Sequence, residues 1–248
     1  MSTPLTITEI LSRSEQGMTR PFLCRGEDGL LYYVKGRYAG YRALCCEWVA
    51  GRLGVLLGLP IPDFCIGEVP RGLVQDSSRA DATDLGAGLV FASQLVEDAQ
   101  EITFAEAGRI DLNLKLQVLL FDWWVRNEDR SLTEFGGNPN LLTAARDGTL
   151  RVFDLNLAFD EGFDEARFWQ THVFGGAVSG WPDEFKNEMV GQMRTALAGL
   201  PGLWQELPDE WLHPHGNASG PGELDLMAVR ATLERFEQSP DEFWAIRR

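Results

Sequence analysis

Apolar and polar positions alternate in short runs through the first hundred residues. The stretch RPFLCRGEDGLLYYVKG, residues 20–36, predicts an antiparallel hairpin whose turn is GEDG. FCIGEV at 64–69 and GLVFASQLV at 88–96 predict two more strands, and residues 74–88 between them are expected to form a polar, Gly-rich loop. The N-terminal part of the chain is therefore expected to be rich in strands.

A helical period appears first after residue 40 and then dominates the chain from residue 101. YRALCCEWVAGRLGVLLGLP carries apolar residues at helical spacing, which predicts a helix of about 17 residues ended by Gly58 and Pro60. The strongest helical pattern is RIDLNLKLQVLLFDWWVRN, with a start near Asp111. Trp123 and Trp124 within it are expected to belong to the core rather than to bind a ligand.

The remaining pattern completes an α+β architecture. NLLTA and LRVFD predict two short strands joined by the turn ARDG, and helices are expected at 164–170, 183–199 and 223–238. We therefore expect one domain with a strand-rich N-lobe, residues 1–97, and a mainly helical C-lobe, residues 98–248. The hinge is expected near residues 94–98, and the cleft between two lobes is the default ligand site.

Composition narrows the possible partners. The net charge of −15 argues against direct nucleic-acid binding and against an anionic membrane surface. No apolar run reaches 18 residues, and no signal peptide is evident at the start, so a cytoplasmic location is expected. The four cysteines show neither a disulfide framework nor a metal-binding spacing, and we expect buried thiols.

Lysine is scarce enough that each one is informative. Only Lys35, Lys115 and Lys186 occur, and Lys35 ends a predicted strand. Its ammonium could bind nucleotide phosphates, with Glu47 on the following helix holding it in place. The competing interpretation is a solvated surface ion pair.

Carboxylates and carboxamides follow the long apolar helix and the last strands. Asn127, Asp129, Asn138 and Asn140 lie within the stretch RNEDRSLTEFGGNPN, and Asp154 ends an apolar strand. Asp129 could accept a proton from an alcohol, and oxygen ligands such as Asn140 and Asp154 suit Mg²⁺. The alternative is a turn rich in Asn and Asp for backbone reasons.

The order Lys, Glu, Asp, Asn, Asp, together with its local wording, resembles the HipA-like kinases, relatives of the phosphoinositide lipid kinases. The resemblance runs through most of residues 15–160 and is carried by GMTRPFL, YYVKG, EWVAGRLGVLLGLPIPDFCIGEV, FDWWVRNEDR with NPNLL, and VFDLNLAF. It implies a two-lobed, protein-kinase-like fold with ATP and Mg²⁺ as cofactors. The reaction implied is transfer of the γ-phosphate to a hydroxyl, expected to be a Ser or Thr of a protein substrate.

The resemblance also implies residue roles. Lys35 corresponds to the lysine that binds the ATP phosphates, and Asp129 corresponds to the catalytic base. Asn140 and Asp154 correspond to the Mg²⁺ ligands, and Asn138 is the second choice for the position given to Asn140. Two short segments are similar to the phosphate-covering loop and the adenine hinge of the family: Gly17, Met18, Thr19 and Arg20, and then Ser93, Gln94 and Leu95. Some family members are toxins, which implies an antitoxin or other regulatory partner.

Two features depart from the family pattern. Asp129 and Asn140 are eleven positions apart, where about five to seven are expected, so LTEFGG is interpreted as an insertion in the catalytic loop. Leu155 follows Asp154 where a His is common. Ser131 and Thr133, beside Asp129, are candidate autophosphorylation sites.

Three alternative functions stay open at this point. The insertion would also suit an inactive pseudokinase or a nucleotide-binding interaction module. A small-molecule phosphotransferase of the aminoglycoside or choline type ranks lower, because no His precedes Asp129, and a P-loop NTPase lacks its motif. A metal site formed by His172, His213 and His215 ranks below a plain surface loop.

Overall fold

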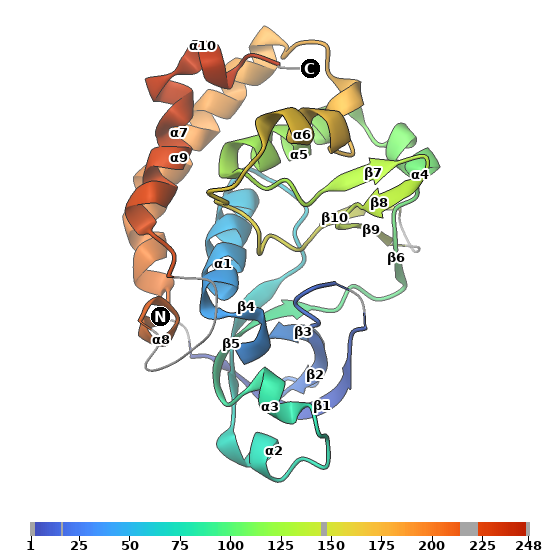
Figure 1. Ribbon diagram of the computed structural model, residues 1–248, viewed down its shortest axis with the longest axis vertical. Coiled ribbons are helices and arrows are strands. Elements are labelled where there is room, and N and C mark those ends of the chain that lie inside the picture. Colours follow the sequence, from blue (N-terminus) through green and yellow to red (C-terminus); the bar gives the residue numbers. More distant parts are fainter. Residues whose placement is uncertain (1–2, 16, 145–147, 214–222, 247–248) are drawn as a thin grey trace. The chain divides into compact units, whose positions relative to one another are not determined.

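The protein, described by a computed structural model, is divided into two compact units (Figure 1). The structure describes residues 3–15, 17–144, 148–213 and 223–246. Unit 1 comprises Met1–Trp48, Pro62–Glu97 and Gln205–Leu224, and unit 2 comprises Val49–Ile61, Asp98–Trp204 and Asp225–Arg248. The predicted α+β class is confirmed, with a strand-rich N-terminal region and a helical C-terminal part.

Five strands of unit 1 close into a barrel in the order β1-β2-β3-β5-β4. The pairs are antiparallel except β1 with β4, whose parallel pairing closes the barrel. The predicted hairpin at 20–36 is confirmed as β2 and β3, whereas β1 was not predicted. The strands are β1 (Leu5–Arg13), β2 (Phe22–Gly26), β3 (Leu31–Lys35), β4 (Phe64–Val69) and β5 (Gly88–Gln94).

The barrel is filled by small and branched apolar side chains. Ile7, Cys24, Val34, Val90 and Ala92 are buried there together, each from an inward-facing strand position. Because successive strand residues point to opposite faces, this alternation fixes which side of β3 faces solvent and which faces the core.

The predicted helix at 41–57 is confirmed as α1 (Tyr41–Leu56), which begins in unit 1 and ends in unit 2. It stops where sequence reasoning placed its end, because Gly58 adopts a φ of 76° that other residues avoid. Cys45 and Cys46 are buried thiols on this helix, and burial raises the pKa of Cys45 to about 12.

The loop predicted for residues 74–88 is wrong in part, because short helices interrupt it. η1 (Arg37–Ala39), α2 (Arg71–Gln75), α3 (Ala82–Leu85) and α8 (Asp209–Leu212) complete unit 1. Ala82 and Leu85 are buried, and Leu85 packs so closely on Gly36 that a Cβ at Gly36 would collide with its backbone. Two buried apolar residues are too few to show a helical period, so the sequence of residues 74–88 predicted a loop.

Unit 2 is built on a central apolar helix, α5 (Leu112–Val125), whose N-cap Asp111 accepts hydrogen bonds from the amides of Asn113 and Leu114. Trp123 and Trp124 on it are buried, as predicted for core residues, and their indole N–H groups donate to the carbonyls of Phe243 and Leu233. The other helices of the unit are α4 (Phe104–Arg109), α6 (Glu165–Thr171), η2 (Gly175–Ala177), most of α7 (Asp183–Glu206), α9 (Leu226–Gln238) and α10 (Pro240–Phe243).

Two small antiparallel sheets complete unit 2. One has the order β10-β9-β6 and the other is the hairpin β7-β8. The predicted strand pair is confirmed as β9 and β10, although residues 145–147 of its turn lie outside the described residues. The strands are β6 (Ala99–Glu101), β7 (Ser131–Thr133), β8 (Gly136–Asn138), β9 (Leu141–Ala144) and β10 (Leu150–Val152). Among the described helices, none is long and apolar enough to cross a membrane.

Candidate active site

Lys35 and Glu47 form a buried ion pair in unit 1. Lys35 ends β3 and Glu47 lies in α1, and the lysine Nζ donates to Oε1 of the glutamate. The two residues are only 8% and 4% exposed, so the solvated surface pair considered from the sequence does not describe them. An ammonium held by a carboxylate at the end of a strand is positioned to bind a phosphate oxygen.

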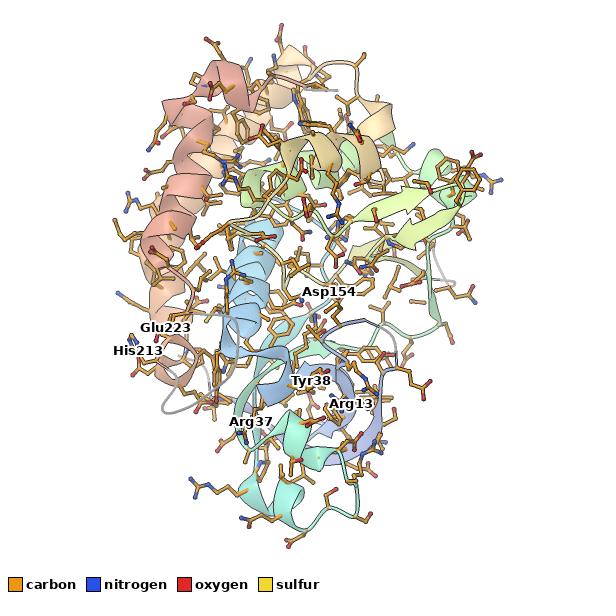
Figure 2. The ribbon with its side chains drawn as sticks, viewed as in Figure 1. Arg13, Arg37, Tyr38, Asp154, His213 and Glu223 are labelled. Carbon is orange, nitrogen blue, oxygen red and sulfur yellow. The ribbon has the colours of Figure 1, made fainter. Side chains whose placement is uncertain are left out.

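The segment Gly17–Arg20 connects β1 to β2 in the same unit. Its base is closed by a 2.8 Å hydrogen bond from the amide of Ser14 to the carbonyl of Pro21. Arg13, shown with Tyr38 in Figure 2, donates from Nε to the carbonyl of Arg20 at 3.3 Å, and its guanidinium lies over the Tyr38 ring. The segment's glycine has a positive φ and Met18 is almost fully exposed, as suits a loop that covers a ligand.

The expected adenine hinge, Ser93–Leu95, lies at the end of β5. The amide of Gln94 donates to the carbonyl of Asp63, and the amide of Leu95 donates to the carbonyl of Leu31, at 2.7 and 2.8 Å. These bonds hold the end of the strand in place, and its role toward adenine stays a prediction.

Asp129 in unit 2 is surrounded by the two asparagines predicted beside it. Asn138 and Asn140 each donate an amide hydrogen to Asp129 Oδ2, at 3.0 and 3.1 Å, and Asn140 also donates to the Asp129 carbonyl at 2.8 Å. The structure therefore brings together residues that the sequence separates by up to eleven positions.

The insertion between them is the hairpin β7-β8, which projects without separating its two ends. Ser131 pairs with Asn138 and Thr133 with Gly136, and Gly137 has no room for a side chain, since a Cβ would lie 2.9 Å from the Leu132 Cα. The hairpin thus returns the chain to Asp129, which explains how the longer spacing keeps the carboxylate and carboxamide in contact.

Asp154, labelled in Figure 2, follows β10, and its charge influences the ionisation of Asp129. Burial raises the pKa of Asp129, and the negative charge of Asp154 adds to that effect, while hydrogen bonds from Asn138 and Asn140 oppose it. A carboxylate whose pKa is raised is a better proton acceptor than an ordinary one.

The backbone at the two candidate metal ligands is unusual. Asn140 has a φ of 45° and Asp154 a φ of 57°, a left-handed region that Asn and Asp enter more readily than other non-glycine residues. Because the Asn140 Nδ2 is used on Asp129, its Oδ1 is the atom that can face a cation. Together with the Asp154 carboxylate it makes a hard oxygen donor set, which fits Mg²⁺ completed by phosphate and water.

A histidine metal site receives no support from the described residues. His172 is buried in unit 2 and bonded to Asp122, and His213 is exposed in unit 1, whereas His215 lies outside the described residues. Within the described part of the chain, no group of three or more His, Cys, Asp or Glu residues could hold a metal ion.

Sequence reasoning missed a cluster of three buried polar residues beside the candidate base, although it had considered one of them, His172, as a metal ligand. Asp122, Arg130 and His172 form a connected cluster that other groups of unit 2 complete. Asp122 interrupts the apolar run LLFDWW, and a carboxylate inside such a run must find a partner. The interrupted apolar run was therefore a visible signal. Its partner His172, which directly follows α6, is fifty residues away and cannot be identified from the sequence.

The fold and the family comparison identify a kinase-like protein. A model of the HipA-like kinase family matches residues 7–247, so the chain belongs to the HipA-like kinase family, as the sequence resemblance implied. The crystal structure of the proinflammatory kinase CtkA from Helicobacter pylori is similar over 98% of both chains, with 11% identity and a TM-score of 0.50, which supports the kinase fold.

Two other comparisons add little. The MAP kinase LmaMPK10 from Leishmania major shares 12% identity over 98% of this chain and 81% of its own, with a TM-score of 0.27 that is too low to support an argument. No protein in the curated set matches the chain.

Proposed function

We propose that this HipA-like kinase transfers the γ-phosphate of ATP, in the presence of Mg²⁺, to a Ser or Thr hydroxyl of a protein. The observation that supports the proposal most is the contact of Asp129 with Asn140, next to Asp154, at the end of an apolar helix and strand pair. A base, a carboxamide and a second carboxylate in this order are what phosphoryl transfer requires of a protein.

Asp129 acts as the base that orients the acceptor. Both asparagine amides donate to its Oδ2, which leaves Oδ1 as the oxygen we assign to the acceptor hydroxyl. The raised pKa of Asp129 strengthens its affinity for the hydroxyl proton as the new bond to phosphorus forms. The proton passes from the hydroxyl to this carboxylate, and ADP leaves.

Each unit carries candidate residues for the cofactors. Asn140 Oδ1 and the Asp154 carboxylate would hold Mg²⁺, which neutralises phosphate charge when bound. Lys35, fixed by Glu47, binds a phosphate oxygen, Gly17–Arg20 covers the phosphates, and Ser93–Leu95 contacts adenine. An antitoxin or regulatory partner remains a prediction from the family resemblance.

The test measures transfer of labelled γ-phosphate from ATP to Ser/Thr peptides, to small alcohols and to the protein itself. Asp129→Asn should lower the transfer rate by about 10²–10⁴-fold while leaving ATP affinity close to that of the parent. Glu134→Gln, which removes an exposed carboxylate from the tip of the same hairpin, is the charge-matched control and should keep the parent rate.

Three results would overturn all or part of the proposal. Asp129→Asn could transfer phosphate at the parent rate, in which case Asp129 is not the base. The parent could bind ATP with Mg²⁺ and transfer nothing to any acceptor class, which would favour the nucleotide-binding interaction module. Transfer to small alcohols but not to peptides would move the acceptor to the small-molecule class.

A further inference from the structure

A buried charged cluster lies directly behind the candidate base. The Asp122 carboxylate accepts hydrogen bonds from Arg130 Nε at 2.7 Å, from His172 at 3.0 Å and from the Asn127 side-chain amide at 2.8 Å. The side chains of Asp122 and Arg130 are 0% exposed. Asp122 belongs to α5, and Arg130 is the residue after Asp129, so the cluster ties the candidate catalytic segment to the central helix.

The guanidinium of Arg130 also reaches the two segments that carry the candidate metal ligands. Its Nη1 donates to the carbonyl of Asn140, to that of Pro139 at 3.4 Å and to that of Phe153 at 3.3 Å. Asn140 is one candidate ligand, and Phe153 immediately precedes the other. The planar Arg130 guanidinium, with its several N–H donors, therefore fixes the backbone beside both ligands. A lysine could not form these hydrogen bonds in the same geometry.

His172 orients the carboxylate from the opposite side. Its Nδ1 accepts a hydrogen bond from the amide of Phe174 at 3.1 Å, so the ring hydrogen is on Nε2, which donates to Asp122. The carbonyl of Arg130 in turn accepts from the amide of Val173 at 3.0 Å. The segment after α6 is thereby bonded to both members of the buried pair.

Stability alone is a weak reason for such a cluster. A buried ion pair is often no more stabilising than apolar residues of the same volume. The backbone that Arg130 contacts is, however, in the strained left-handed region at Asn140, and again at Asp154 one residue beyond its contact with Phe153. Strained conformations persist only where the surroundings hold them, and the Arg130 guanidinium is one of the groups that bond to this backbone.

We infer that Arg130, held by Asp122 and His172, is a positioning residue that sets the spacing of the two Mg²⁺ ligands before any metal binds. This inference rests on the proposed function for the meaning of Asn140 and Asp154. The cluster would act through hydrogen bonds to the backbone beside the ligands and would not touch the metal. At other metal sites, loss of a group that orients a ligand in this way costs about 10–100-fold in metal affinity.

The experiment compares Arg130→Lys with Arg235→Lys. Arg235 is a partly buried arginine of unit 2 that also donates to backbone carbonyls, those of Thr232, Trp123 and Trp124, away from the candidate ligands. Hydrogen exchange of the metal-free proteins is measured by mass spectrometry for peptides containing residues 138–142 and 152–155. A second measurement gives the Mg²⁺ concentration that half-saturates the effect of Mg²⁺ on ATP affinity.

We expect Arg130→Lys to speed exchange in both peptides and to raise the half-saturating Mg²⁺ concentration about tenfold or more, within the range known for such groups. Arg235→Lys should lower thermal stability while leaving both quantities at the parent value. The inference is overturned if folded Arg130→Lys matches the parent in both, or if Arg235→Lys changes them equally.

A second variant keeps the result decisive if Arg130→Lys does not fold. Asp122→Asn preserves the shape of the side chain, removes its charge and replaces one accepting oxygen by a donating amide group, and it should give the same two changes. Unchanged exchange in a folded Asp122→Asn would contradict the inference. Hydrogen exchange is measured without nucleotide. Failure of the parent protein to bind ATP would therefore count against the proposed function and not against the positioning role of Arg130.

Discussion

At the scale of single residues, the buried pair of Lys35 and Glu47 separates stability from function. Removing one member of a buried pair costs about 3–5 kcal/mol, whereas replacing both by apolar residues is often close to neutral. We predict that Glu47→Leu lowers the unfolding free energy by about that amount, and that Lys35→Met/Glu47→Leu recovers most of it. Chemical denaturation of the three proteins measures both effects.

The same double variant should still fail to bind ATP, because its phosphate-binding ammonium is gone. Isothermal titration with ATP and Mg²⁺ provides the comparison. A double variant with recovered stability and the ATP affinity of the parent would show that Lys35 is a structural residue only.

His172 should make the protein sensitive to mild acid. Burial holds the pKa of His172 below its ordinary value of 6.5, although the Asp122 contact opposes that shift. As pH falls below about 6.5, the unfolded chain gains a proton at this position that the folded protein does not. Stability is therefore complete above that pH and declines below it, by at most about 1.4 kcal/mol per pH unit for one group.

The measurement is the change in unfolding free energy between pH 7 and pH 5. We expect His172→Gln to lose less stability across this window than the parent does, even though its stability at pH 7 is lower. His213→Gln, at an exposed position, is the control and should keep the parent slope. Equal slopes in the parent and His172→Gln would contradict the account.

At the scale of elements, two glycines with opposite surroundings test the hairpin and a helix. A Cβ at Gly137 would collide with the backbone of β7, so Gly137→Ala should disrupt the hairpin and lower the transfer rate. Gly191 lies in α7 with no atom near its missing Cβ, so Gly191→Ala should raise the unfolding free energy by about 0.5–1 kcal/mol. Thermal unfolding and the transfer assay measure both variants, and a fully active Gly137→Ala would show that the hairpin geometry is dispensable.

The elements predicted from sequence carry an apolar helical period or a short apolar segment. α1 and α5 extend over enough turns to show the period, and β4, β5, β9 and β10 are short, mainly apolar segments between turn signals. β1 was missed because its register shifts near Ile7 and again near Ile10, which breaks the alternation.

β7 and β8 were missed for a different reason. They are three residues each and largely exposed, so they carry no hydrophobic pattern. Lys35, Glu47, Asp129, Asn140 and Asp154 could be proposed because their residue types and order point to one chemistry. The Arg130 contacts could not, because its acceptors are backbone carbonyls, which leave no trace in the sequence.

At the scale of the whole molecule, the charge of the chain bears on how a nucleotide can be bound. With 22 Lys and Arg residues against 37 Asp and Glu residues, the chain carries a net charge of −15 that disfavours an anionic nucleotide, so we expect Mg²⁺ to supply much of the neutralisation. Nucleotide binding should accordingly depend strongly on the metal.

The most direct test is thermal unfolding of the protein titrated with ATP, with and without Mg²⁺. A ligand at a hundredfold excess over its Kd stabilises the folded state by about 2.7 kcal/mol. We predict that ATP raises the unfolding temperature only with Mg²⁺, and that this rise is lost in Asp154→Ala. The control is Asp160→Ala, which removes a carboxylate a few positions further along the chain and should retain the rise. An ATP-induced rise that is equal without Mg²⁺, or equal in Asp154→Ala, would contradict the assignment of Asp154 as a metal ligand, and no rise under any condition would contradict the kinase site itself.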